Sequence, residues 1–201
     1  MKYLIFICII FSMGCSSYSD KLPILGNYEI HGNDTIHATI PSFNFTDQNY
    51  QIVNNSTFRQ KIYLADFMFL NCSTICPKMA TEMKKVYNVF KKNSNILFIS
   101  HTIDPFNDSI PRLYQHANLL KVNHKKWRFV TGNQSQLQNI AEEGYFSIAY
   151  PDSTAIGGFT HSGAFILVDK YQHVRGVYDG TNPTETSKVI ADIKNLLREQ
   201  F

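Results

Sequence analysis

Residues 62–77 read IYLADFMFLNCSTICP and combine the signals of a strand, a loop and a helix start. The first nine of these residues are apolar except for Asp66, a pattern typical of a strand that is buried on both faces of a sheet. A loop with Cys72 follows, and Pro77 suits the first turn of a helix directly after Cys76. Apolar residues then recur at helical spacing, which predicts a helix over residues 77–92.

Strand-like and helix-like segments alternate along the rest of the chain. The predicted strands cover residues 96–99, 128–131, 164–168 and 174–178, with a strand-rich stretch over 43–58 and a β-hairpin over 28–40. The predicted helices cover residues 108–120, 134–143 and 183–199. This order predicts an α/β fold with a partly parallel sheet covered on both faces. The closing hairpin and helix favour a thioredoxin-like fold with an N-terminal β-hairpin extension.

The first fifteen residues, MKYLIFICIIFSMGC, have the features of an export signal. The apolar run Tyr3 to Phe11 is too short for a membrane span of about 20 residues, but it suits the core of a signal peptide. Met13-Gly14-Cys15 resembles a bacterial lipobox, although Ser12 stands where leucine is usual. We therefore expect a lipidated Cys15 after residues 1–15, a tether over 16–27 and one domain over 28–201. An uncleaved anchor and ordinary secretion are the alternatives.

Composition narrows the function further. The 201 residues are 44% hydrophobic and carry a net charge of only +3 without a dense basic block, which argues against a disordered chain and against nucleic-acid binding. Of the four cysteines, Cys8 is lost on cleavage and Cys15 takes the lipid. Cys72 and Cys76 then remain in an oxidising compartment, where such a pair forms either a disulfide or a metal site.

The chemistry is expected at the carboxyl ends of the strands, where open α/β sheets place their sites. Cys76 would lie at a helix N-terminus, which favours its thiolate, with Cys72 one turn earlier. An inert structural disulfide is the alternative, but such bonds stabilise most when they close long loops. His161 lies in a flexible glycine loop before the strand over 164–168 and would face the cysteines. Two thiolates and one imidazole suit Cu(I) well, and Zn(II) less well without a fourth ligand.

Other polar residues carry weaker hypotheses. Asp66 is costly in an apolar strand unless it has a partner or a role. Thioredoxins have an aspartate at the same offset, six residues before the first cysteine, where it serves proton transfer; a hydrogen-bonded structural aspartate is the alternative. His101 and Asp104 are candidates for a secondary site, although we expect His101 to be an exposed loop histidine. Asp108 is expected to cap a helix.

The chain resembles the SCO/SenC family of copper-binding, thioredoxin-like proteins over about residues 40–198. The matching landmarks, in order, are C-x-x-x-C-P at Cys72 to Pro77, Ile103-Asp104-Pro105 with Asp108-Ser109-Ile110-Pro111, Trp127 with Thr131-Gly132, and His161-Ser162 leading to Asp169. The resemblance implies that Cys72, Cys76 and His161 bind copper as Cu(I), with Cu(II) left open. Asp66 departs from the family pattern and adds weight to thiol redox chemistry.

By this resemblance, the protein delivers copper to the binuclear copper centre of cytochrome c oxidase during assembly, or reduces the thiols of that centre. The expected partner is the copper-centre subunit or another envelope thiol protein. We expect the domain to meet this partner outside the cytoplasm of a bacterium, where a lipid anchor holds the domain at the membrane. A thiol-disulfide oxidoreductase that uses the Cys72/Cys76 pair is the main alternative, and a copper sensor is not separable from it. A peroxide-reducing enzyme ranks last, because no arginine lies near either cysteine in the sequence.

Overall fold

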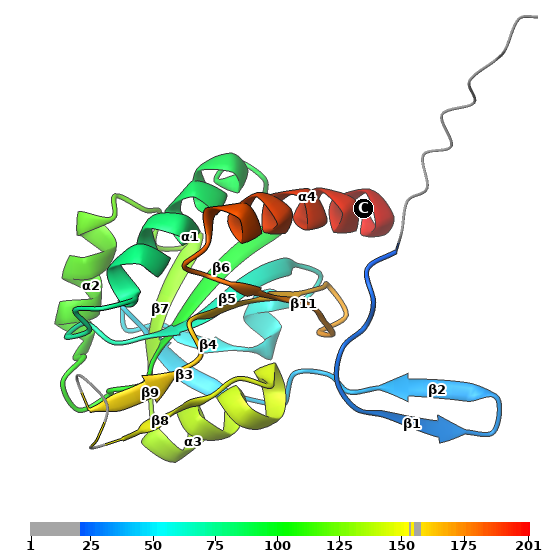
Figure 1. Cartoon of the computed structure of the whole chain (residues 1–201), viewed down its shortest axis with the longest axis horizontal. Helices are drawn as coiled ribbons and strands as arrows, with labels where there is room; N and C mark the ends of the chain where they lie inside the picture. The colour runs from blue at the N-terminus through cyan, green and yellow to red at the C-terminus, as the bar shows by residue number, and fades with distance from the viewer. Residues whose placement is uncertain (1–20, 153, 155–157) are drawn as a thin grey trace, which may run out of the picture.

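The computed structural model describes residues 21–152, 154 and 158–201, so the predicted signal and Cys15 lie outside the described residues. A seven-stranded sheet in the order β11-β10-β5-β6-β7-β3-β4 forms its centre (Figure 1). Strands β5, β6 and β7 are parallel, and the other neighbours in the sheet are antiparallel. The strands of this sheet are β3 (Asn44–Asp47), β4 (Ile52–Asn54), β5 (Ile62–Met68), β6 (Ile96–Thr102), β7 (Trp127–Thr131), β10 (Ala164–Val168) and β11 (Val174–Asp179).

Helices cover both faces of this sheet, and two small hairpins stand outside it (Figure 1). The helices are α1 (Cys76–Phe90), α2 (Ile110–Leu119), α3 (Gln134–Asn139) with a π-helical turn η2 (Ile140–Gly144), and α4 (Pro183–Gln200), with a 3-10 turn η1 (Asn55–Phe58). The hairpins are β1 (Tyr28–His31) with β2 (Asp34–His37), and β8 (Ala149–Pro151) with β9 (Phe159–His161). The predicted thioredoxin-like α/β class and the N-terminal hairpin are confirmed.

The central strand β5 is buried along its whole length, as its apolar sequence predicts. From β5 the chain crosses through α1 to β6 and through α2 to β7, whereas β10 lies on the other side of β5. The strand order therefore reverses beside β5, and open α/β sheets bind their ligands at the carboxyl ends of the strands at such a point. The cysteine loop leaves β5 at this end.

Three local predictions were wrong. Strand β6 continues to Thr102, so His101 is buried within the sheet instead of exposed in a loop. Asp108 does not cap α2, because its carboxylate accepts hydrogen bonds from other elements. His161 lies on strand β9, where a flexible glycine loop was expected. The first and third errors arose because pairing with other strands extended β6 and created β9. The second arose because the hydrogen-bond partners of Asp108, Leu70 and Thr102, lie on other segments of the chain.

Residues 22–25, part of the predicted tether, pack against the domain. Leu22 and Leu25 are partly buried against the core, and the Leu25 N–H donates to the Val174 carbonyl at 2.8 Å. The buried Arg175 guanidinium donates to the carbonyl groups of Leu22 and Pro23. The chain is thus attached to β11 from Leu22 onward. In the part of the chain that the structure describes, no helix is long and apolar enough to cross a membrane.

We expect Asp169→Asn to destabilise the domain by about 3 kcal/mol, because it removes the closer and fully buried ion-pair partner of the buried Arg175 guanidinium. Asp169 is fully buried, lies 2.8 Å from Arg175 and also accepts the backbone N–H groups of Tyr171 and His173. Urea denaturation would measure the loss. Glu199→Gln is the matched control: Glu199 is partly exposed and 3.4 Å from Arg175, so it should cost under about 1 kcal/mol. Equal losses for both variants would contradict this role of Asp169.

Candidate metal centre

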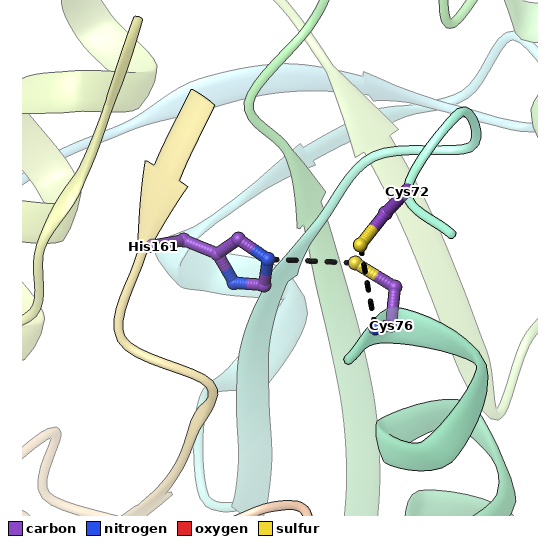
Figure 2. A group of neighbouring side chains, drawn as sticks. All are labelled: Cys72, Cys76 and His161. Atoms are coloured by element: carbon purple, nitrogen blue, oxygen red, sulfur yellow. Dashed lines mark hydrogen bonds between the residues drawn. The ribbon is translucent and has the colours of Figure 1, made fainter. Parts of the chain in front are cut away.

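The fold brings Cys72, Cys76 and His161 together from three different segments. Cys72 lies in the loop after β5, Cys76 begins α1, and His161 ends β9. One ligand atom from each residue lies within 4.8 Å of the other two. Figure 2 shows the His161 ring pointing from its strand toward the two sulfur atoms. The sequence placed these residues together correctly, although they are up to 89 positions apart in the chain (161 − 72).

The contacts within this group are short and specific. The His161 Nε2 atom lies 3.5 Å from Cys76 Sγ, and the Cys76 backbone N–H donates to Cys72 Sγ at 3.5 Å (Figure 2). The Thr74 hydroxyl also lies 3.5 Å from Cys72 Sγ. Both cysteines are free thiols in this structure. The three side chains are therefore close enough to contact one shared ion.

The two thiols differ in acidity, in the opposite sense to the sequence-based expectation. Burial raises the pKa of Cys76 far above its usual range, and this outweighs the helix N-terminus that was expected to favour its thiolate. Burial also raises the pKa of Cys72, but hydrogen bonds from Thr74 and Cys76 more than offset it and bring the pKa to about 7. Cys72 is the half-buried and more acidic thiol, so it is the one that meets other molecules first.

His161 is held as a neutral ring. Burial lowers its pKa, so the imidazole keeps a lone pair for a metal ion. Its ring packs edge-on against Phe69, with the ring centroids 5.9 Å apart. Its Nδ1 atom is buried and has no hydrogen-bond partner in the part of the chain that the structure describes. Two thiols and a neutral imidazole form a soft donor set, which fits Cu(I) better than it fits a hard cation.

Gly163 lets the chain turn between His161 and β10. Its φ angle is +59°, in the left-handed region that favours glycine. A Cβ atom there would also lie 3.2 Å from the Ile75 side chain in the cysteine loop. The Gly163 carbonyl accepts the Gly180 N–H at 2.9 Å, which ties this turn to the residue after β11. The position of His161 relative to the cysteines therefore depends on glycine at this turn.

Sequence reasoning missed the residues that hold the cysteine loop. The buried Asp108 carboxylate accepts the Leu70 N–H at 3.0 Å and the Thr102 hydroxyl at 2.6 Å, which joins the ends of β5 and β6. Arg112 donates to the Asn71 side chain at 2.8 Å, directly before Cys72. Asp108 belonged to a recognised motif but was interpreted as a cap. Arg112 is near the cysteines in space and distant from them in sequence, so only the fold reveals it.

Asp66 lies beneath the cysteines on β5. It is 3% exposed, and its Oδ1 atom has no hydrogen-bond partner among the described residues. Burial raises its pKa to about 7, against a smaller lowering effect of a hydrogen bond from Ser100. Asp66 lines the same cavity as Cys72 and Cys76. A carboxyl group that titrates near neutral pH beside a buried thiol can exchange protons there.

His101 and Asp104 do not join the metal-ligand group. The His101 ring is fully buried, stacks on Phe67 with centroids 5.0 Å apart, and has a pKa lowered to about 3 by burial. Its register partner on β5 is Phe67, whereas Asp66 pairs with Ser100, so His101 faces the opposite side of the sheet from Asp66. Asp104 accepts hydrogen bonds from Asn107 and holds the turn before α2. The contacts of both residues therefore favour a structural role.

The fold and this group define a thioredoxin-like protein with a Cys-x-x-x-Cys loop and a facing histidine. The SCO1/SenC family model matches residues 32–198, and the chain belongs to this family. A SCO1/SenC family lipoprotein from Bacillus anthracis str. Ames has a similar structure, with TM-score 0.72, 27% identity, and coverage of 79% of this chain and 95% of that one.

Two further solved structures are similar. BsSco, a member of the Sco family of cytochrome c oxidase assembly proteins with an identified disulfide switch, matches with TM-score 0.68 and 28% identity over 79% of this chain and 92% of its own. ScoI from Bradyrhizobium japonicum, solved with copper bound, matches with TM-score 0.66 over 79% of this chain and 99% of its own. At 19% identity, this similarity shows a shared fold alone.

We expect iodoacetamide to modify Cys72 well before Cys76 in the reduced, metal-free protein. Because the thiolate is the nucleophile and the pKa of Cys72 is about 7, its rate should rise about tenfold from pH 6 to pH 8. Mass spectrometry of the peptides would follow each cysteine. Thr74→Val removes a hydrogen bond that lowers this pKa, so it should shift the profile to higher pH. Comparable rates at the two cysteines would refute the assigned difference in acidity.

Proposed function

We propose that this protein binds copper through Cys72, Cys76 and His161 and takes part in the assembly of cytochrome c oxidase. The observation that carries the proposal is the convergence of two thiols and a neutral imidazole within 4.8 Å at the switch point of the sheet. The donor set suits Cu(I). Membership of the SCO1/SenC family supports it, because similar structures include an oxidase assembly protein and a copper-bound protein.

The geometry suits transfer of copper as a cargo. Three protein ligands leave a Cu(I) ion with room for an incoming thiolate, and the half-buried Cys72 is the more accessible of the two thiols. A thiolate of the copper-centre subunit can therefore join the ion before Cys72 leaves it. Cys76 is buried, and the His161 ring packs against Phe69. These two residues would hold the ion until exchange is complete.

A second function, reduction of a partner's disulfide, is favoured by the unequal thiols. The Cys72 thiolate would attack the disulfide, form a mixed disulfide and release one partner thiolate. Cys76 would then attack Cys72 Sγ, close the Cys72–Cys76 disulfide and release the second thiolate, so the partner gains two electrons. Because burial raises the pKa of Cys76, this step needs a base, and Asp66 in the shared cavity would accept the proton. Copper binding and disulfide formation exclude each other, which lets redox state control delivery.

Titration of the reduced protein with Cu(I), against a competing chelator, would separate these functions. We expect one copper per chain, bound at least about tenfold more weakly in His161→Ala and Cys72→Ser, because each loses one ligand. His31→Ala is the matched control, since His31 is exposed on the β1–β2 hairpin. An unchanged Cu(I) affinity in His161→Ala would contradict a three-ligand site. Retained disulfide reduction in that variant would then favour the oxidoreductase.

We also propose that the domain acts outside the cytoplasm of a bacterial cell on a lipid attached to Cys15. The apolar segment and lipobox-like residues 13–15 support this, as does the similarity to a Bacillus anthracis lipoprotein. Mass spectrometry of the membrane fraction should show a chain that begins at a diacylglyceryl Cys15. Cys15→Ser should abolish this lipid modification. An intact Met1 to Cys15 segment without lipid would disprove the proposal.

A further inference from the structure

A cavity of about 320 Å³ opens beside the cysteines, between α1, α2 and the sheet. Asp66 lines this cavity. The three metal ligands do not need the space inside the cavity to bind an ion. Most of the cavity wall is apolar, with Met68, Leu119, Leu120 and Phe129 among the lining residues. Ligand cavities start at about 300 Å³, so this one suits a single ring rather than an extended molecule.

The sheet side of the cavity carries polar lining residues. Asp66, Ser100 and Trp127 line it from the neighbouring strands β5, β6 and β7. The Trp127 Nε1–H donates to Ser100 Oγ at 2.9 Å, so the Ser100 hydroxyl has its own proton left for Asp66. Asp66 Oδ1 is then a buried polar atom for which the described residues supply no hydrogen bond, on a residue that lines a mostly apolar cavity. A buried carboxyl oxygen in this state lacks the hydrogen bond that nearly all such atoms have.

The mouth of the cavity points to what enters it. Cys72, the half-buried thiol, is on its lining, and so is Leu119, which is 81% exposed on α2. A polypeptide whose thiol reaches Cys72 therefore has a neighbouring side chain within reach of the cavity. The missing partner of Asp66 must be polar, while the surrounding wall requires an apolar or aromatic body. A phenol meets both demands, because its hydroxyl donates to a carboxylate and also accepts from a protonated carboxyl.

We propose that this cavity binds the phenol ring of a tyrosine that the partner polypeptide carries next to the thiol reacting at Cys72. The inference rests on the proposed exchange at Cys72 and adds a recognition element to it. The ring fills the apolar space between α1 and α2, and its hydroxyl completes the hydrogen bonding of Asp66. Partner choice is then made by a pocket adjoining the metal site and not by the three ligands alone.

Titration with 4-methylphenol tests the pocket independently of any exchange reaction. In amide NMR spectra of the reduced, metal-free protein, it should cause saturable shifts around Ala80, Ser100 and Leu120. Toluene lacks the hydroxyl and should bind at least about tenfold more weakly, because the buried carboxyl group then stays unpaired. Equal affinity for the two rings, or no saturable shift at these residues, would overturn the proposal.

Three variants sharpen this test. Ala80→Leu adds bulk to the half-buried wall of the cavity on α1 and should weaken 4-methylphenol binding at least tenfold. Ala191→Leu adds the same bulk on the exposed side of α4 and should leave binding unchanged. Asp66→Leu should make the affinities for 4-methylphenol and toluene equal. Binding that survives Ala80→Leu would place the ring elsewhere and refute the assignment.

Thiol exchange with two model peptides tests the link to Cys72. The peptides Tyr-Gly-Cys and Ala-Gly-Cys each carry 2-nitro-5-thiobenzoate in disulfide linkage on the cysteine. The Cys72 thiolate attacks the peptide sulfur, a protein–peptide disulfide forms, and the coloured thiolate leaves. We expect the tyrosine peptide to react at least about tenfold faster, with the difference lost in Ala80→Leu. Equal rates would refute the tyrosine pocket, whereas no reaction with either peptide would count against the proposed thiol chemistry itself.

Discussion

Burial of β5 on both of its faces determines how the other elements are arranged. A strand with all seven residues buried must lie inside the sheet with helices on either side. From β5 the chain continues to β6 and β7 on one side, and β10 later pairs with β5 on the other side. The loop after β5 and the turn before β10 are therefore brought to one place, and the three candidate ligands come from those segments.

The site combines tight restraint with unequal exposure. Asp108 joins the ends of β5 and β6, Arg112 holds Asn71, and Gly163 allows the turn that places His161. Within this frame one thiol is buried and weakly acidic, while the other is accessible and ionises near neutral pH. Metal transfer and disulfide exchange both need such a difference, because one sulfur must meet the partner while the other retains hold of the cargo or completes the reaction. The same geometry thus supports both candidate functions.

The sequence predicted the class of fold and the three converging residues, because apolar runs, helical spacing and cysteine spacing are local patterns. It did not predict what depends on pairing between distant segments. The short pairing of β8 with β9 carries His161, and the extension of β6 against β5 and β7 buries His101. The roles of Asp108 and Arg112 require knowing which loop lies beside α2. The reversed acidity of the cysteines follows from their burial, which spacing along the chain does not reveal.

The attachment of residues 22–25 to β11 has a consequence for where the protein can search for partners. It leaves only residues 16–21 between Cys15 and the domain, and six residues span at most about 20 Å. Figure 1 shows this attachment on the side of the domain away from β9. With Cys15 in a bilayer, as proposed, encounters become two-dimensional and favour partners embedded in the same membrane. A short tether of this kind raises the local concentration of such partners without any additional contact.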